Sequence, residues 1–168
     1  MFFSRWTLYQ AVIIILLVVL SFIADIFKEE IAIPFSSSME TNTPMLITFL
    51  FVVTVIGLLS LLMYFQTKKS DTFLKHPLWD KMHILMPFLF VISLIVIFSF
   101  FLIEPLSDLV QNNRWMIYVL FYYVLFLINA TVLSIIHKTN RNRISNENKV
   151  KFSFVWTSLA LFLIIFIL

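Results

Sequence analysis

Apolar residues along the chain gather into five long runs separated by short polar segments. Each run approaches the roughly 20 apolar residues that a helix needs to cross a bilayer core of about 30 Å, and none has a charge in its interior. Lipid offers the backbone no hydrogen-bonding partner, so these runs predict helices despite their many β-branched and aromatic residues. The predicted spans are residues 6–24, 45–65, 84–103, 115–136 and 152–168.

These spans predict an all-α fold class, a polytopic membrane helical bundle with five transmembrane helices. Residues 1–168 form a single transmembrane domain, because no connection between the runs is long enough to fold alone. Ala24 is followed by Asp25, Ile26 and Phe27, which is no small-x-small cleavage site, so we expect the first run to be a retained anchor. The polar and basic segment 137–151 allows either a short loop or an extension of the fourth helix.

Charged residues divide unevenly between the two sides that five alternating spans define. Ten of the 12 basic residues lie near the N-terminus, between the second and third spans, or between the fourth and fifth spans, all on one side. The positive-inside rule makes this side cytoplasmic, and we predict the orientation N-in and C-out. The compact chain, without recognisable targeting signals, favours a bacterial cytoplasmic (inner) membrane. The acidic residues expected on the opposite side are Asp25, Glu29, Glu30, Glu40, Glu104 and Asp108.

Composition agrees with a lipid environment and removes several function classes. The chain is 61% hydrophobic and 12% charged, whereas soluble domains are about 45–50% apolar and about 25% charged. It contains no Cys, which excludes disulfides, thiol nucleophiles and Cys-ligated metals. It contains one Gly, which excludes the Gly-rich loops that cradle phosphates.

Neutral polar and small residues recur at helical spacing inside the spans. Such residues mark helix–helix contacts, because lipid supplies no hydrophobic drive between helices. Asn129 is the most informative of them, since a buried carboxamide must find a partner. An alternative interpretation is a pore or lipid groove lined by Asn129, Tyr122 and Thr54. On the fifth span Ser153, Thr157 and Ala160 share a face. The candidates for helix packing or pore lining are Gln10, Ser21, Thr54, Gly57, Ser60, Tyr118, Tyr122, Asn129 and Ser134.

The sequence contains few sets of residues that could form a metal, haem or acid–base site. His76, Asp80 and His83 have spacings that a helix would bring together as metal ligands, but Pro77 disfavours a helix through them. His83 and His137 have the side chain that binds haem, yet both are expected at the membrane edge. Two of the outer acidic residues would suffice for acid–base or cation chemistry, but an acidic surface explains them more simply. We predict no catalytic residue, no cofactor, no metal and no enzyme activity.

Five basic residues are candidates for contact with anionic inner-leaflet lipids or with an acidic protein partner. Each such residue near a membrane attracts anionic lipid by about 1 kcal/mol. Topology already accounts for the basic connections, so no nucleic-acid partner is expected. The candidates are Lys68, Lys69, Lys138, Arg141 and Arg143.

Three function classes remain open. The preferred prediction is a non-enzymatic membrane subunit that forms a homo-oligomer or holds a protein partner, docking through its basic cytoplasmic loops. One alternative is a small pore, channel or membrane-perturbing effector. Another is a toxin-immunity or phage-defence membrane protein, which rests only on analogy with other small apolar proteins. The lack of ionisable residues near mid-membrane disfavours a proton-coupled transporter or pump.

Overall fold

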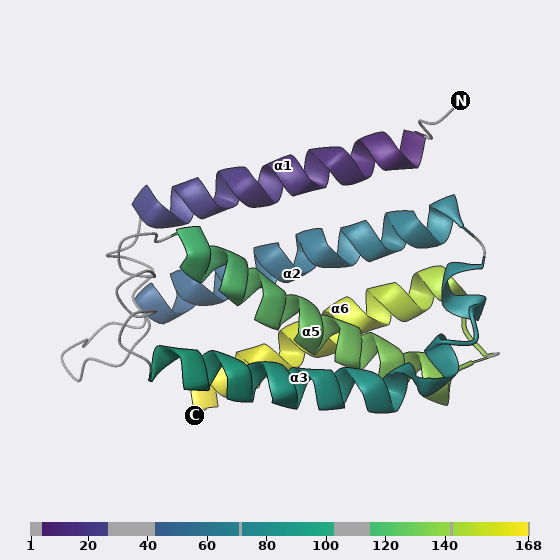
Figure 1. The fold of residues 1–168 in the computed structure, drawn as a ribbon. Coiled ribbons are helices and arrows are strands. Elements are labelled where there is room, and N and C mark those ends of the chain that lie inside the picture. Colours follow the sequence, from purple (N-terminus) through teal and green to yellow (C-terminus); the bar gives the residue numbers. More distant parts are fainter. Residues whose placement is uncertain (1–4, 27–42, 71, 103–114, 142, 168) are drawn as a thin grey trace.

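The computed structural model describes residues 5–26, 43–70, 72–102, 115–141 and 143–167 (Figure 1). In this part of the chain there are five long helices and no strand. All five are long and apolar enough to cross a membrane, which confirms the predicted all-helical class and indicates a multi-pass membrane protein. The elements are α1 (Arg5–Ile26), α2 (Thr43–Lys69), the 3₁₀ helix η1 (Phe73–Lys75), α3 (Trp79–Phe101), α5 (Trp115–Thr139) and α6 (Asn146–Ile167).

The helices continue beyond the predicted apolar runs at their polar ends. α3 begins at Trp79 instead of residue 84, and α6 begins at Asn146 instead of residue 152. The segment 137–151 is therefore mostly helical, with a short turn between α5 and α6. Ser145 Oγ accepts a hydrogen bond from the backbone N–H of Asn148 at 3.3 Å, as an N-cap does at a helix start. Apolar runs mark the part of a helix suited to lipid, and these helices extend past it into polar sequence.

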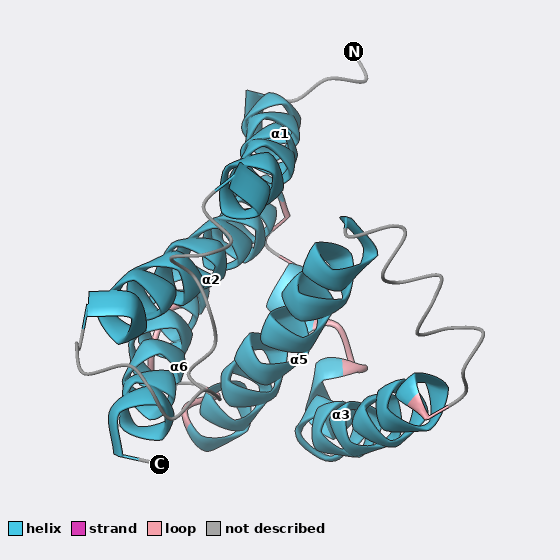
Figure 2. Ribbon diagram, turned by 90° about the vertical axis from the view of Figure 1, so that its left-hand side faces the viewer, coloured by secondary structure: helices cyan, strands magenta, loops and turns pink. Residues whose placement is uncertain are grey.

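The helices do not pack in chain order. Side by side they run α1, α2, α6, α5, α3 (Figure 2). α2, α5 and α6 each contact the other two and form the centre of the bundle. α1 lies at one margin against α2, and α3 lies at the other margin against α5. The polar residues that join three helices, described below, lie in this central group.

Two apolar clusters fill the bundle. The first joins α1, α2, α5 and α6 around Val55 and Ile56, both fully buried. The second joins α2, η1, α3, α5 and α6 around Leu74 and Leu133. The second cluster contains Trp79, which ties the start of α3 to the centre.

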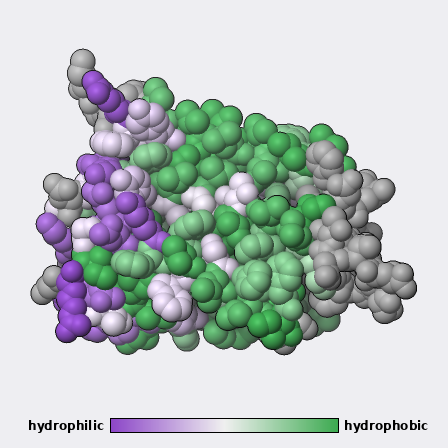
Figure 3. All heavy atoms as spheres, turned by 180° about the vertical axis from the view of Figure 1, so that it is seen from behind, coloured by the Kyte–Doolittle hydropathy of each residue, from purple (hydrophilic) through white to green (hydrophobic). Residues whose placement is uncertain are grey.

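One end of the bundle is hydrophilic and its flank is apolar (Figure 3). We call this hydrophilic region the basic end. It consists of the start of α1 at Arg5, the α2–η1–α3 connection and the α5–α6 turn, which lie together in Figure 1. The many exposed large apolar side chains along the helices suit a lipid surrounding. Of the predicted acidic residues of the opposite end only Asp25 is described; the others lie outside the described residues.

Candidate functional site

The centre of the bundle contains a closed group of polar side chains, the polar node, made of Ser60, Asn129, Ser153 and Thr157. Asn129 has no exposed surface. Its Nδ2 donates to Ser60 Oγ at 2.8 Å. Its Oδ1 accepts from Ser153 Oγ at 2.7 Å and from Thr157 Oγ1 at 3.3 Å. The Ser153 hydroxyl also lies 3.0 Å from the Asn129 backbone carbonyl oxygen. One carboxamide on α5 therefore joins α2 and α6.

The local sequence explains how the polar node forms. Ser153 and Thr157 lie four residues apart, so both face the same side of α6. Gly57 and Ser60 lie three residues apart on α2, and a Cβ at Gly57 would meet Phe154 of α6 at 3.6 Å. Small side chains let α2 and α6 approach closely, which is typical of helix contacts in lipid. The predicted need of Asn129 for a partner is met by three hydroxyls.

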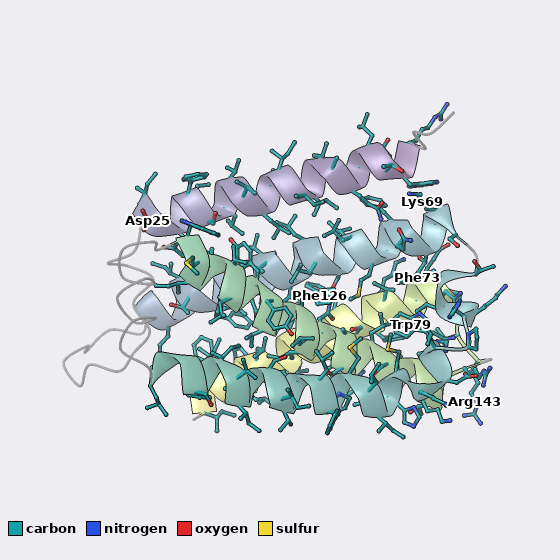
Figure 4. All side chains as sticks on the ribbon, in the orientation of Figure 1. Asp25, Lys69, Phe73, Trp79, Phe126 and Arg143 are labelled. Carbon is teal, nitrogen blue, oxygen red and sulfur yellow. The ribbon has the colours of Figure 1, made fainter. Side chains whose placement is uncertain are left out.

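The other predicted packing residues have separate locations. Gln10 Nε2 donates to Gln66 Oε1 at 3.0 Å, which joins α1 to α2. Tyr122 Oη donates to the Leu17 carbonyl at 3.3 Å, which joins α5 to α1. Tyr118 Oη lies 3.5 Å from Asp25 Oδ1 at the end opposite the basic end (Figure 4). These three side chains join α1 to its neighbours, away from the polar node.

Three predicted candidates bond within their own helices. Ser21, Thr54 and Ser134 each donate to a backbone carbonyl three or four residues earlier. Ser134 is buried, whereas Thr54 is exposed on α2. Thr54 therefore does not share a lining with Asn129, which is sealed inside the bundle.

Two ion pairs cross the basic end. Lys68 Nζ lies 2.6 Å from Glu147 Oε1 and joins α2 to α6. Arg141 Nη1 lies 2.8 Å from Asp80 Oδ1 and joins the α5–α6 turn to α3. Both pairs are partly exposed, and such pairs are typically worth about 0–1 kcal/mol. Two of the five predicted contact residues thus already have acidic partners within the chain.

The remaining three predicted contact residues, Lys69, Lys138 and Arg143, are exposed and form no ion pair with the described residues. Figure 4 shows Lys69 at the end of α2 and Arg143 in the α5–α6 turn, both at the basic end. The unpaired positive charge of this end is therefore spread across both connections.

The sequence does not predict that Lys149 is buried. It is 1% exposed, and its Nζ donates to the Arg141 carbonyl oxygen at 2.8 Å and to Asn146 Oδ1 at 3.4 Å. The ammonium thus holds the α5–α6 turn closed from inside. A run of basic residues gives no local signal that one of them turns inward.

The histidines do not assemble into a ligand set. His76 precedes α3, and its Nδ1 accepts the backbone N–H of Leu78 at 3.3 Å. His137 is buried against the Trp79 ring, with 5.8 Å between ring centroids. Within the described ranges no three His, Asp or Glu side chains gather as a metal site would require.

Two apolar hollows lie between the helices. One has a volume of about 380 Å³ between α2 and α6, beside the polar node. The other has a volume of about 370 Å³ and is lined by α1, α2, α5 and α6 in the half away from the basic end. Both volumes lie within the range of about 300–1,000 Å³ that small-molecule sites occupy.

The described residues form a buried polar node that packs helices together and an exposed basic end that can bind a partner. The polar node uses its hydrogen-bonding groups on itself, and the basic end presents unpaired cations. Comparisons of the chain with protein-family models, with curated proteins and with solved structures found no match.

Proposed function

We propose that the protein is a non-enzymatic membrane subunit that holds an acidic protein partner at its basic end. The proposal depends on the contrast at this end between basic residues that form ion pairs within the chain and basic residues that do not. Lys68 and Arg141 are paired within the chain, whereas Lys69, Lys138 and Arg143 are exposed without an acidic partner among the described residues. Complementary charge of this kind steers and orients a protein partner.

The proposal includes an orientation. With the basic end cytoplasmic, the chain is N-in and C-out, and the membrane is a bacterial cytoplasmic one. The positive-inside rule supports this orientation, and it places the docking surface where soluble acidic partners are present.

The polar node supports packing more than conduction. Asn129, Ser153 and Thr157 have no exposed surface and bond to one another. A water-filled path would require such groups to face a cavity, but Asn129, Ser153 and Thr157 line neither hollow, and Ser60 is the one member of the polar node that does.

The test is gentle extraction of the protein from its own membrane, followed by native mass spectrometry. We expect a stoichiometric second protein with the wild type. The triple variant Lys69→Gln, Lys138→Gln, Arg143→Gln should weaken the partner's binding by up to roughly a hundredfold and so lose it on extraction, because exposed ion pairs are worth up to about 1 kcal/mol each. The matched control, Lys69→Arg, Lys138→Arg, Arg143→Lys, keeps every charge and should retain the partner.

Removing basic residues can also alter insertion, so a reporter fused at each end should show unchanged orientation in both triple variants. A wild-type protein that emerges without a companion would contradict the proposal. So would a partner that the neutral variant holds as well as the wild type does.

A further inference from the structure

The hollow between α2 and α6 has the form of a groove with an apolar floor and a basic rim. Its floor includes Gly57 and Ser60 of α2 and Val150 of α6. Leu61 and Val155 form its edges and are 44% and 53% exposed, so the groove opens on the flank of the bundle. In a membrane this flank faces the acyl chains.

The groove exists because α2 lacks a side chain where α6 places a large one. A Cβ at Gly57 would stand 3.6 Å from the Phe154 ring, so even one added methyl reaches ordinary contact. From Gly57 to Tyr64 the groove follows α2 for about 10 Å. This length and the apolar lining fit a segment of an acyl chain.

The basic rim lies at the Tyr64 end of the groove. The ammonium groups of Lys68 and Lys151 lie 5.8 Å and 5.9 Å from the centroid of the Tyr64 ring. Glu147 accepts the Lys68 ion pair at 2.6 Å and a hydrogen bond from Tyr64 Oη at 3.4 Å. Its charge is offset by the Lys68 ion pair and lies within electrostatic reach of Lys151. Lys151 is exposed and forms no ion pair with the described residues, so two ammonium groups and one carboxylate leave the rim net positive.

We propose that this groove binds one anionic phospholipid, with an acyl chain along Gly57 and Phe154 and the phosphate at Lys151. A lysine at the end of an apolar surface extends its ammonium to the headgroup region while its methylenes stay in the apolar zone. The net positive rim selects a negatively charged lipid, and the apolar groove holds the chain in register. The site does not depend on the protein partner proposed above.

The test uses the full-length protein in vesicles of equal parts phosphatidylglycerol and phosphatidylcholine, extracted gently for native mass spectrometry. We expect the wild type to retain one phospholipid, predominantly phosphatidylglycerol. Lys151→Gln should lower the retained phosphatidylglycerol about fivefold, the ratio that corresponds to about 1 kcal/mol for one basic residue. Gly57→Leu should abolish retention of either lipid, because its side chain fills the groove.

Two variants serve as matched controls. Lys75→Gln removes an exposed charge of the same end but outside the groove. Ala160→Leu adds similar apolar bulk on the exposed side of α6. Both should retain lipid as the wild type does. Circular dichroism should show that Gly57→Leu is folded, and Lys151→Gln, altered at an exposed side chain, tests the headgroup contact independently.

Three results would overturn the proposal. The first is a wild type that retains no phospholipid. The second is retention that Lys151→Gln and Lys75→Gln reduce equally, or that does not distinguish the two headgroups. The third is a groove occupied by a helix of another protein, seen as a cross-link from Leu61 or Val155 to protein instead of lipid.

Discussion

α3 and α5 lie side by side and are both apolar for most of their length, yet the bundle holds them differently. α5 buries seven residues, whereas no residue in the most apolar 18-residue window of α3 is buried. The one buried side chain described on α3 is Trp79, its first residue. Because lipid is as apolar as leucine, apolarity does not draw a helix to the centre. A side chain that needs a partner, such as Asn129, does.

The largest expected effect on the difference between α3 and α5 comes from removing Trp79, the buried side chain that holds the start of α3. Trp79→Ala should lower the free energy of unfolding by about 3 kcal/mol, as loss of a large buried aromatic side chain does. The measurement is unfolding in mixed micelles followed by circular dichroism. Trp156→Ala, at a 57% exposed position on α6, should change the stability little.

The position of α3 gives a second readout for the same variant. The Ser93 and Tyr123 hydroxyls lie 2.8 Å apart between α3 and α5, and the chain has no Cys. A Ser93→Cys, Tyr123→Cys pair should therefore react with a short bifunctional thiol cross-linker, which spans the gap left where the shorter cysteine replaces the tyrosine ring. The cross-link should form more slowly when Trp79→Ala is added. If cross-linking and stability match those of Trp156→Ala, then α3 does not depend on this anchor.

Asn129→Leu tests the centre of the bundle. It should lower the free energy of unfolding by about 2 kcal/mol, because interhelical hydrogen bonds in lipid are worth about 0.6–1.7 kcal/mol and the added bulk strains a filled site. The same micelle titration provides the measurement. Thr54→Val removes a hydroxyl that bonds only within α2 and should have little effect. Equal losses for the two variants would refute a special role for the polar node.

The smallest expected effect concerns the flank of α3. Ser93→Ala removes the hydrogen bond to Tyr123 and should lower the free energy of unfolding by about 0.6 kcal/mol. Ser99→Ala is the control, since that hydroxyl bonds to the Ile95 carbonyl of its own helix. A loss above about 1.5 kcal/mol for Ser93→Ala would mean that α3 has a second strong anchor along its length.

The sequence predicts the five helices well because apolar length is a local property. It also predicts that Asn129 needs a partner, but not which one, since Ser60 lies 69 residues away and the packing order of the helices is not a local property. The buried face shared by Ser153 and Thr157 was predicted correctly, but Ala160, predicted on the same face, is exposed. The place of this face against Asn129 depends on how α5 and α6 turn. Lys149 looks like a surface charge until the turn that closes over it is known.

The pairing of Lys68 with Glu147 and of Arg141 with Asp80 is also non-local. These residues lie far apart in sequence and meet because the α2–η1–α3 connection and the α5–α6 turn gather at one end. Charge counting therefore identifies the basic side, but only the folded arrangement separates paired from unpaired cations. That separation narrows the predicted docking residues from five to Lys69, Lys138 and Arg143.

In a membrane, the hydrogen bonds of the polar node form in the order in which its helices are synthesised. Chains emerge from the N-terminus onward, so Ser60 enters the bilayer before Asn129, and Ser153 enters after both. The amide nitrogen of Asn129 meets Ser60 as soon as α5 arrives, while its oxygen waits for α6. In that interval the Asn129 Oδ1 lies in lipid without a hydrogen-bond donor. A polar group of another protein can bind it at this stage, until α6 supplies the hydroxyls of Ser153 and Thr157.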